Sequence, residues 1–190
     1  MKISFNAPVT LILTVSALIV MILAQTRQGY STTNLFSTYP TSQFDALTFV
    51  RMFTHILGHA GWDHFLANFT LILVLGPLLE ERHGSFQLFG MILITAFVTA
   101  LLNNIFFTNG LLGASGVVFM MILLSSITNI RSKTIPATFI IVVVLFLGRE
   151  IVNSLTNDNI SQFAHIVGGI CGSFFGFFKK SDNTQQTVHH

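Results

Sequence analysis

Four polar residues whose types could carry out hydrolysis lie inside apolar stretches of the chain: Ser115, His165, His64 and Asn68. A serine hydroxyl becomes a nucleophile when a neutral imidazole accepts its proton, and histidine or asparagine side chains can donate hydrogen bonds to the anion that forms. Polar side chains within apolar stretches are costly and are therefore first candidates for function. If the fold brings these four together, their residue types predict a serine hydrolase site.

The elements that must position them follow from composition. Of the 190 residues, 52% are hydrophobic and 8% charged, against roughly a quarter charged in a soluble domain. Such a chain cannot cover its apolar surface in water, which indicates an integral membrane protein and excludes disorder. Six stretches approach the ~20 apolar residues of a spanning helix, at about 8–24, 62–79, 86–107, 111–130, 135–152 and 161–178. We expect an all-α polytopic membrane protein with one six-helix domain over residues 1–180 and a polar tail at 181–190.

The charge and the cysteine content limit which partners, disulfides and metal sites the chain is expected to have. The net charge of +2 is scattered along the chain without a basic run, so that nucleic acid is not an expected partner, whereas membrane lipid is. A single cysteine, Cys171, excludes a disulfide framework and a cysteine-based metal site. We expect no metal and no cofactor. The first apolar stretch is expected to be a retained helix, because Ile22, two residues before a candidate cleavage point, is not small.

Orientation follows from the basic residues, which gather on the cytoplasmic side of membrane proteins. With the N-terminus inside, that side holds Lys2, Arg82, Arg131, Lys133, Lys179 and Lys180, and the outside holds Arg27, Arg51 and Arg149. Both termini are therefore predicted to be cytoplasmic. The connection at about 25–61 is then external, and it is too long for an idle loop in so small a protein.

The candidate residues fall at one depth. Each lies at a similar distance from the charged residue at the predicted cytoplasmic end of its own stretch. The separations are 16 residues from His64 to Glu80, 16 from Ser115 to Arg131 and 14 from His165 to Lys179. At about 1.5 Å per residue these separations are roughly 21–24 Å. In a hydrocarbon core about 30 Å thick, the shared layer is some 6–9 Å below the outer surface. The three stretches all enter from outside, so the positive ends of their dipoles meet at this layer, which favours a developing negative charge.

Spacing adds information about facing. His64 and Asn68 are four residues apart and share one helix face. His165 is followed by a stripe of glycines at Gly168, Gly169, Gly172 and Gly176. Small residues at this spacing let membrane helices approach closely. If the partner is the stretch that contains Ser115, the base comes within reach of the nucleophile.

Five short motifs occur in a fixed order over about residues 49–178. They are Arg51-Met52-Phe53-Thr54-His55 with His59; His64-Phe65-Leu66-Ala67-Asn68; the turn with Gly76, Glu80, Arg82 and Gly84; Gly113-Ala114-Ser115-Gly116; and Ala164-His165-Ile166-Val167-Gly168 with Gly172. Each motif is weak alone. Together and in this order they resemble the rhomboid family of intramembrane serine proteases.

The resemblance implies a six-helix core in which Ser115 is the nucleophile and His165 the general base, without a carboxylate. It implies that His64, Asn68 and the Ser115 amide bind the oxyanion. The implied substrates are transmembrane segments of membrane proteins, cleaved near the outer face after a small side chain. The second and fifth spans would form a lateral gate, and residues 153–162 would form a loop that caps the site. The resemblance also implies that the protein resides in a bacterial cell (inner) membrane.

Two positions depart from the family's pattern. Val50 stands where tryptophan is common before the loop arginine, and Phe119 where tyrosine is common four residues after the serine. Phe119 lacks only the hydroxyl, so we expect it to stack on His165.

Other interpretations remain. His55, His59 and His64 could be three metal ligands, but no carboxylate accompanies them and His-Glu-x-x-His is absent. We expect His55 and His59 to be hydrogen-bonded within the external loop. Glu80 and Arg82 are expected to form an ion pair that holds the turn.

Two alternative functions are a catalytically silent rhomboid-like protein that binds membrane clients and a small transporter. Silent relatives generally lose the serine or the histidine, and this chain keeps both. A transporter would need a polar path to the cytoplasm, and the polar layer lies near one face only. The sequence therefore favours the endopeptidase.

Overall fold

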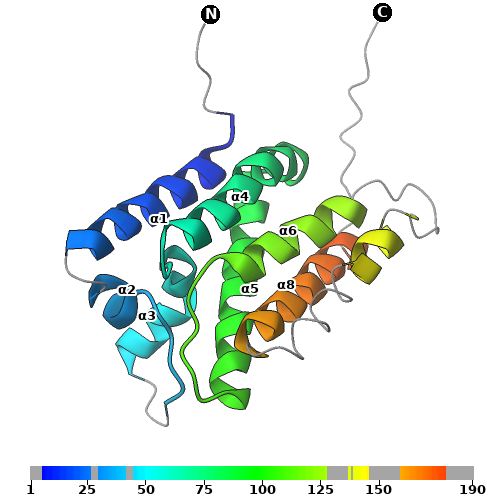
Figure 1. Cartoon of the computed structure of the whole chain (residues 1–190). Helices are drawn as coiled ribbons and strands as arrows, with labels where there is room; N and C mark the ends of the chain where they lie inside the picture. The colour runs from blue at the N-terminus through cyan, green and yellow to red at the C-terminus, as the bar shows by residue number, and fades with distance from the viewer. Residues whose placement is uncertain are drawn as a thin grey trace, which may run out of the picture.

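The computed structural model describes residues 6–26, 30–41, 45–127, 137, 139–145 and 159–178. Within these ranges the regular structure is helical, apart from an isolated antiparallel bridge between Thr38 and Leu111. The helices are α1 (Pro8–Thr26), α2 (Tyr30–Leu35), α3 (Ala46–Thr54), the 3-10 helix η1 (His55–Leu57), α4 (Trp62–His83), α5 (Ser85–Phe106), α6 (Ser115–Ile127) and α8 (Asn159–Phe178) (Figure 1). The expected all-α class is confirmed.

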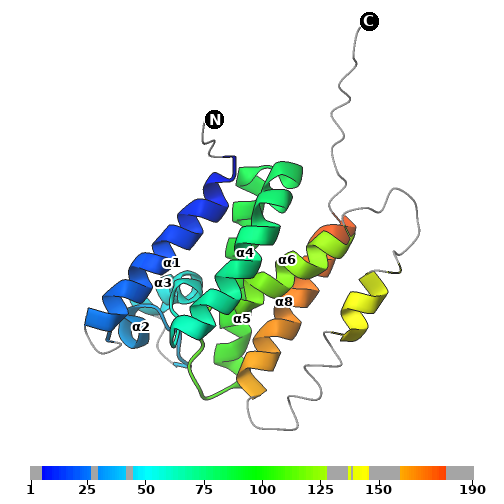
Figure 2. The same ribbon diagram turned by 45° about the horizontal axis from the view of Figure 1, so that its top comes forward.

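Among the described residues, three helices are long and apolar enough to cross a membrane: α1, α4 and α5. The apolar parts of α6 and α8 are shorter, at Ser115–Ile127 and Gln162–Phe178. Most of the expected span at 135–152 lies outside the described residues. Within it, the structure describes residues 137 and 139–145, which are helical. The tail at 181–190 also lies outside the described residues. In both ribbon views, the start of α1 and the ends of α4, α6 and α8 lie toward the same side (Figures 1 and 2).

Two predicted boundaries are wrong. The fourth span was expected from residue 111, but α6 begins at Ser115, because the backbone at Leu111 is extended and pairs with Thr38. The last residues of the expected capping loop, 159–162, belong to α8, which begins at Asn159. The first error matters for the chemistry, since it moves Ser115 from within a helix to its first residue.

The α6–α8 pair is the most intimate contact of the bundle (Figure 2). A Cβ built on Gly168 would lie only 2.7 Å from the carbonyl carbon of Gly116, and one on Gly172 only 2.9 Å from that of Met120. In lipid the hydrophobic effect does not drive helices together, because lipid tails are as apolar as the side chains. Association therefore depends on close van der Waals packing. The glycine stripe therefore brings the two backbones together, as its spacing predicted.

The carboxylate of Glu80 anchors α1 to α4. It accepts hydrogen bonds from the backbone amide of Val9 at 2.9 Å, and from the amide and hydroxyl of Thr10 at 3.0 and 2.9 Å. The first amides of a helix have no intrahelical acceptor, so a buried carboxylate there satisfies them. Close by, Gly76 leaves room for Thr10, whose side chain would lie 2.6 Å from a Cβ. Glu80 thus has a role between helices that the expected ion pair did not include.

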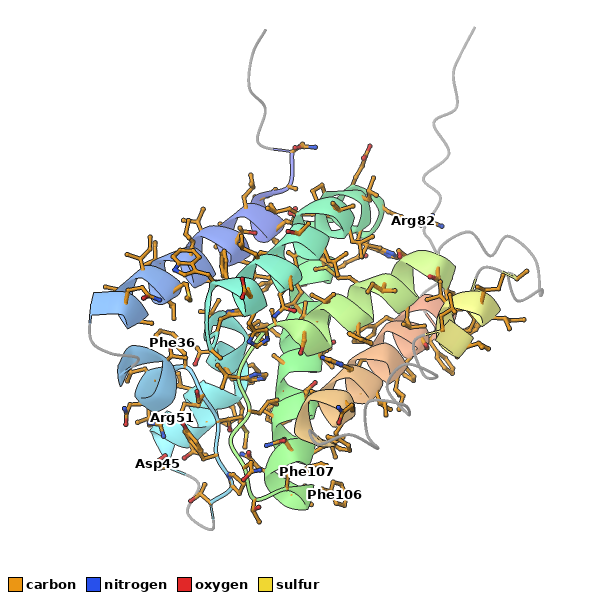
Figure 3. All side chains as sticks on the ribbon, viewed as in Figure 1. Phe36, Asp45, Arg51, Arg82, Phe106 and Phe107 are labelled. Carbon is orange, nitrogen blue, oxygen red and sulfur yellow. The ribbon has the colours of Figure 1, made fainter. Side chains whose placement is uncertain are left out.

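The long connection between α1 and α4 is structured around α2 and α3. Asp45 caps α3 by accepting a hydrogen bond from the Thr48 amide at 2.7 Å. Hydrogen bonding from the side chain and then the backbone of Thr48 lowers the pKa of the Asp45 carboxyl. The Arg51 guanidinium donates to the Asn34 carbonyl on α2. Asp45, Arg51 and Phe36 lie together in this region, whereas Arg82 lies at the opposite end of the bundle (Figure 3). Hydrogen bonds therefore order the connection between α1 and α4.

Candidate active site

Ser115 is the first residue of α6 and follows an extended segment. The segment is fixed by reciprocal bonds, from the Thr38 amide to the Leu111 carbonyl at 3.0 Å and from the Leu111 amide to the Thr38 carbonyl at 2.8 Å. The first α6 hydrogen bond runs from the Val118 amide to the Ala114 carbonyl at 3.0 Å. The Ser115 amide therefore has no acceptor within its own helix. It lies at the positive end of the helix dipole, where a negative charge is stabilised.

Gly113 shapes the turn before the serine. Its φ of 109° lies in the region that favours glycine, and its amide donates to the His55 carbonyl at 2.9 Å. A Cβ at this position would lie 2.7 Å from Cε1 and 2.8 Å from Nε2 of His64. The imidazole of His64 therefore packs directly against the loop that carries Ser115, and no larger residue than glycine fits between them.

His165 is placed by the contact of α8 with α6. Gly168, one turn further along α8, rests on the backbone of Gly116, the residue after Ser115. The His165 ring stacks on Phe119 with a centroid distance of 4.1 Å and an interplanar angle of 6°. Phe119 is one turn of α6 beyond Ser115, so the two contacts hold the imidazole along the helix face on which Ser115 begins. The expected stacking of Phe119 on His165 is confirmed.

His64 and Asn68 reach the same place from α4. The His64 imidazole contacts the turn at Gly113, two residues before Ser115, and packs edge-on against His59 at a centroid distance of 4.9 Å. Asn68 is buried, and its Nδ2 lies 3.8 Å from the position of a Cβ on Gly113. The residues that the sequence placed at one depth are thus gathered around the start of α6.

His59 has the expected bond within its loop and further contacts outside it. His59 was expected to bond within its loop, and its Nδ1 does lie 3.3 Å from the Leu57 carbonyl. Its Nε2, however, lies 3.1 Å from Nδ2 of Asn68 and 3.5 Å from the Ala114 amide. The only sequence signal for His59 was its position in the loop motif, which does not reveal a contact with α4.

His55 also bonds outside its loop. Its Nε2 lies 3.1 Å from the Ala96 carbonyl on α5, so the expectation of bonding within the external loop is wrong for this residue. Burial lowers the pKa of His55 to about 4, and burial together with the nearby His64 lowers the pKa of His59 to about 4. Both imidazoles are therefore neutral at pH 7. In the described part of the chain, no group of three or more histidine, cysteine, aspartate or glutamate side chains is placed to hold a metal ion.

An apolar cavity of about 480 Å³ adjoins His165 between α6, α8 and the helical segment 139–145. Phe119 and Leu123 line it from α6, Phe139 and Val143 from the segment, and Ile166 from α8. The imidazole is thus bordered by the polar cluster on one side and by an apolar space on the other.

The fold and site define a class: an all-helical, polytopic membrane protein with a serine and two histidines gathered at the start of one helix. Residues 46–181 match the Rhomboid domain family. The chain belongs to the rhomboid family, as its motifs indicated, and is an integral membrane protein.

Three relatives illustrate the similarity. Rhomboid-related protein 1 of Caenorhabditis elegans is 31% identical over 139 residues, which cover 67% of this chain and 39% of that protein. RHOMBOID-like protein 1 of Arabidopsis thaliana is 31% identical over 137 residues, which cover 67% of this chain and 33% of that protein. Rhomboid protease GlpG of Haemophilus influenzae is 25% identical over 173 residues, which cover 89% of each chain. The chain spans less than half of the first two relatives and most of the third, whose name describes a protease.

Proposed function

We propose that this protein is an intramembrane serine endopeptidase that cleaves transmembrane segments of membrane proteins near the outer face. The observation that carries the proposal is the position of Ser115 at the first residue of α6, beside a helix face on which His165 is held by Phe119. Membership in a family that includes a named protease supports the same conclusion.

In the proposed mechanism, His165 accepts the proton of the Ser115 hydroxyl as the oxygen attacks the scissile carbonyl. The tetrahedral oxyanion is stabilised by the Ser115 amide and by donors on His64 and Asn68. His165 then gives the proton to the departing amine, which leaves an acyl-enzyme ester on Ser115. Water attacks this ester while His165 takes its proton; as the ester bond breaks, His165 returns that proton to the Ser115 oxygen and the carboxyl product is released.

The packing supports a dyad that works without a carboxylate. In a triad, the third residue orients the imidazole. Here the parallel stack on Phe119, at 4.1 Å, restricts ring rotation, and the contact of Gly168 with Gly116 restricts sliding of α8 along α6. Packing thus performs the orienting function that a carboxylate performs elsewhere.

The surroundings of the dyad support the proposed substrate class. The cavity beside His165 is lined by apolar side chains, including Phe119 and Phe139, and suits a segment that arrives from lipid. We further propose that the protein resides in a bacterial cell membrane, as the family resemblance implies, with both termini in the cytoplasm, as the distribution of lysine and arginine predicts.

Labelling with a fluorophosphonate probe tests the proposal directly. The detergent-solubilised wild type should be labelled covalently, and Ser115→Ala should abolish the label. Ser126→Ala is the matched control, because its hydroxyl lies on the same helix and donates to the Ile122 carbonyl at 2.8 Å. Equal labelling, or none, of the wild type and Ser115→Ala would contradict the endopeptidase and favour a client-binding protein.

The substrate class is tested separately. A panel of tagged single-span proteins is co-reconstituted with the enzyme in liposomes, and the products are mapped by mass spectrometry. Cuts within the outer part of the span that require Ser115 are expected. Ser115-dependent cuts confined to soluble regions would contradict the proposed substrates while leaving the hydrolase in place.

A further inference from the structure

We propose that His59 is a positioning residue of the active site: it fixes the orientation of the Asn68 side-chain amide and holds the backbone that leads into Ser115. The inference rests on the proposed function, because it concerns the oxyanion donors of that reaction. It assigns a role to a side chain that the proposed mechanism does not otherwise use.

The hydrogen bonds of His59 determine which of its nitrogens accepts. Nδ1 lies 3.3 Å from the Leu57 carbonyl oxygen, and a carbonyl can only accept, so Nδ1 carries the proton. Nε2 of the neutral ring is then an acceptor. It lies 3.1 Å from Nδ2 of Asn68, and an amide nitrogen can only donate.

This pairing selects one of the two orientations of the Asn68 amide. If the amide were rotated by half a turn, its oxygen would face the lone pair of Nε2, and two acceptors would oppose each other in a buried place. With the nitrogen toward His59, the second N–H of the same group remains for the reaction. The Asn68 nitrogen lies on the side of Gly113, 3.8 Å from a Cβ position there, and hence close to the loop of Ser115.

The same ring nitrogen also reaches the nucleophile loop. The amide of Ala114, the residue before Ser115, donates to Nε2 of His59 at 3.5 Å. One acceptor therefore ties an oxyanion donor on α4 to the backbone that positions the nucleophile on α6. The bond to Asn68, at 3.1 Å, is the shorter of the two. A change at His59 should therefore act mainly through Asn68, and on the transition state more than on substrate binding.

The His59 ring is itself held in place. It is 2% exposed and packs edge-on against Phe65 and Phe69, at centroid distances of 5.6 and 5.5 Å. Burial keeps it neutral at pH 7, with a pKa of about 4. A fixed, neutral imidazole is a permanent acceptor, which is what the positioning role requires.

The test is a set of variants assayed with a transmembrane substrate in liposomes. His59→Leu fills the space without an acceptor, and we expect it to lower kcat about 10–100-fold, less than complete loss of an oxyanion donor, with KM changed less than about threefold. His59→Gln, which can place an acceptor oxygen near the position of Nε2, should stay within about fivefold of wild type. If His59→Leu does not fold, His59→Met makes the same comparison, because it fills the site without a strong acceptor.

A double-mutant cycle separates positioning from a general loss of structure. If His59 acts through Asn68, His59→Leu should lower kcat less than about threefold further when Asn68→Ala is already present. Equal fold losses in both backgrounds would refute the inference, and so would wild-type turnover in His59→Leu. Absence of Ser115-dependent turnover in the wild type overturns the proposed function and the inference with it, whereas Ser115-dependent turnover that is indifferent to His59→Leu overturns the inference alone.

Discussion

Replacing Gly168 with alanine should displace α8 from α6 and thereby move His165 away from Ser115. The new Cβ would lie 2.7 Å from the carbonyl carbon of Gly116, whereas ordinary contacts begin at 3.4 Å. The obstacle is backbone and cannot rotate away, so α8 must move by at least about 0.7 Å. Since a misplacement of about 1 Å can cost 10²-fold in rate, we expect kcat to fall about 10–100-fold, with about 1–3 kcal/mol of destabilisation from overpacking.

The adjacent Gly169 provides the matched control. A Cβ there would meet the Leu123 side chain at 3.7 Å, which is ordinary van der Waals contact. Gly169→Ala should therefore retain activity within about threefold of wild type, although it makes the same chemical change at the next residue of α8. The assay is cleavage of a tagged single-span substrate in liposomes, with thermal unfolding of each variant in detergent to confirm folding. Wild-type turnover by Gly168→Ala, or an equal loss in Gly169→Ala, would refute the argument that backbone contact sets the geometry of the dyad.

The remaining predictions concern a donor, an anchor and two buried histidines. Asn68→Ala should lower kcat by about 10²–10³-fold, as expected for loss of an oxyanion donor, with probe labelling largely retained; unchanged turnover would remove Asn68 from the mechanism. Glu80→Gln replaces one accepting oxygen by an amide group, so that part of the first turn of α1 loses its acceptor, and unfolding in detergent should become easier by about 1–3 kcal/mol. The exposed Glu81→Gln makes the same change of charge and should have little effect. His55 and His59 have folded pKa values of about 4 against about 6.5 when unfolded, so their stabilising contribution is complete above pH 6.5 and is lost as the pH falls toward 4. At pH 5 the loss is about 2 kcal/mol for each residue. The melting temperature should therefore fall between pH 7 and 5, and His59→Gln should make this fall smaller, whereas an unchanged fall would contradict the assignment.

Much of the architecture was predictable because membrane helices leave a strong hydropathy signal. The expected spans at 8–24, 62–79, 86–107 and 161–178 correspond to α1, α4, α5 and α8. The family could be inferred because its motifs are short, local and ordered. The start of α6 was predicted incorrectly because residues 111–114 are as apolar as the helix that follows, and only the pairing of Leu111 with Thr38 identifies them as extended.

The roles of polar side chains were harder to predict. The glycine stripe after His165 indicated a close helix contact, and Phe119 could be expected to stack on the imidazole, since both signals are spacings within one helix or motif. Glu80 was interpreted through its neighbour Arg82, but its carboxylate accepts from the first turn of α1, about seventy residues away in the chain. No local pattern reports such a partner.

The sequence by itself determined that this chain belongs in a membrane, because too few charged residues are available to cover its apolar surface in water. It also predicted one depth for Ser115, His165 and His64, because helix rise is fixed and the flanking charges are expected to mark the membrane surface. Only the tertiary structure decided how the helices are rotated and how closely they approach. That rotation turns Asn68 toward His59 at 3.1 Å and lays Gly168 on Gly116, since hydrogen bonds depend on direction and distances of tenths of an ångström, which hydropathy does not specify.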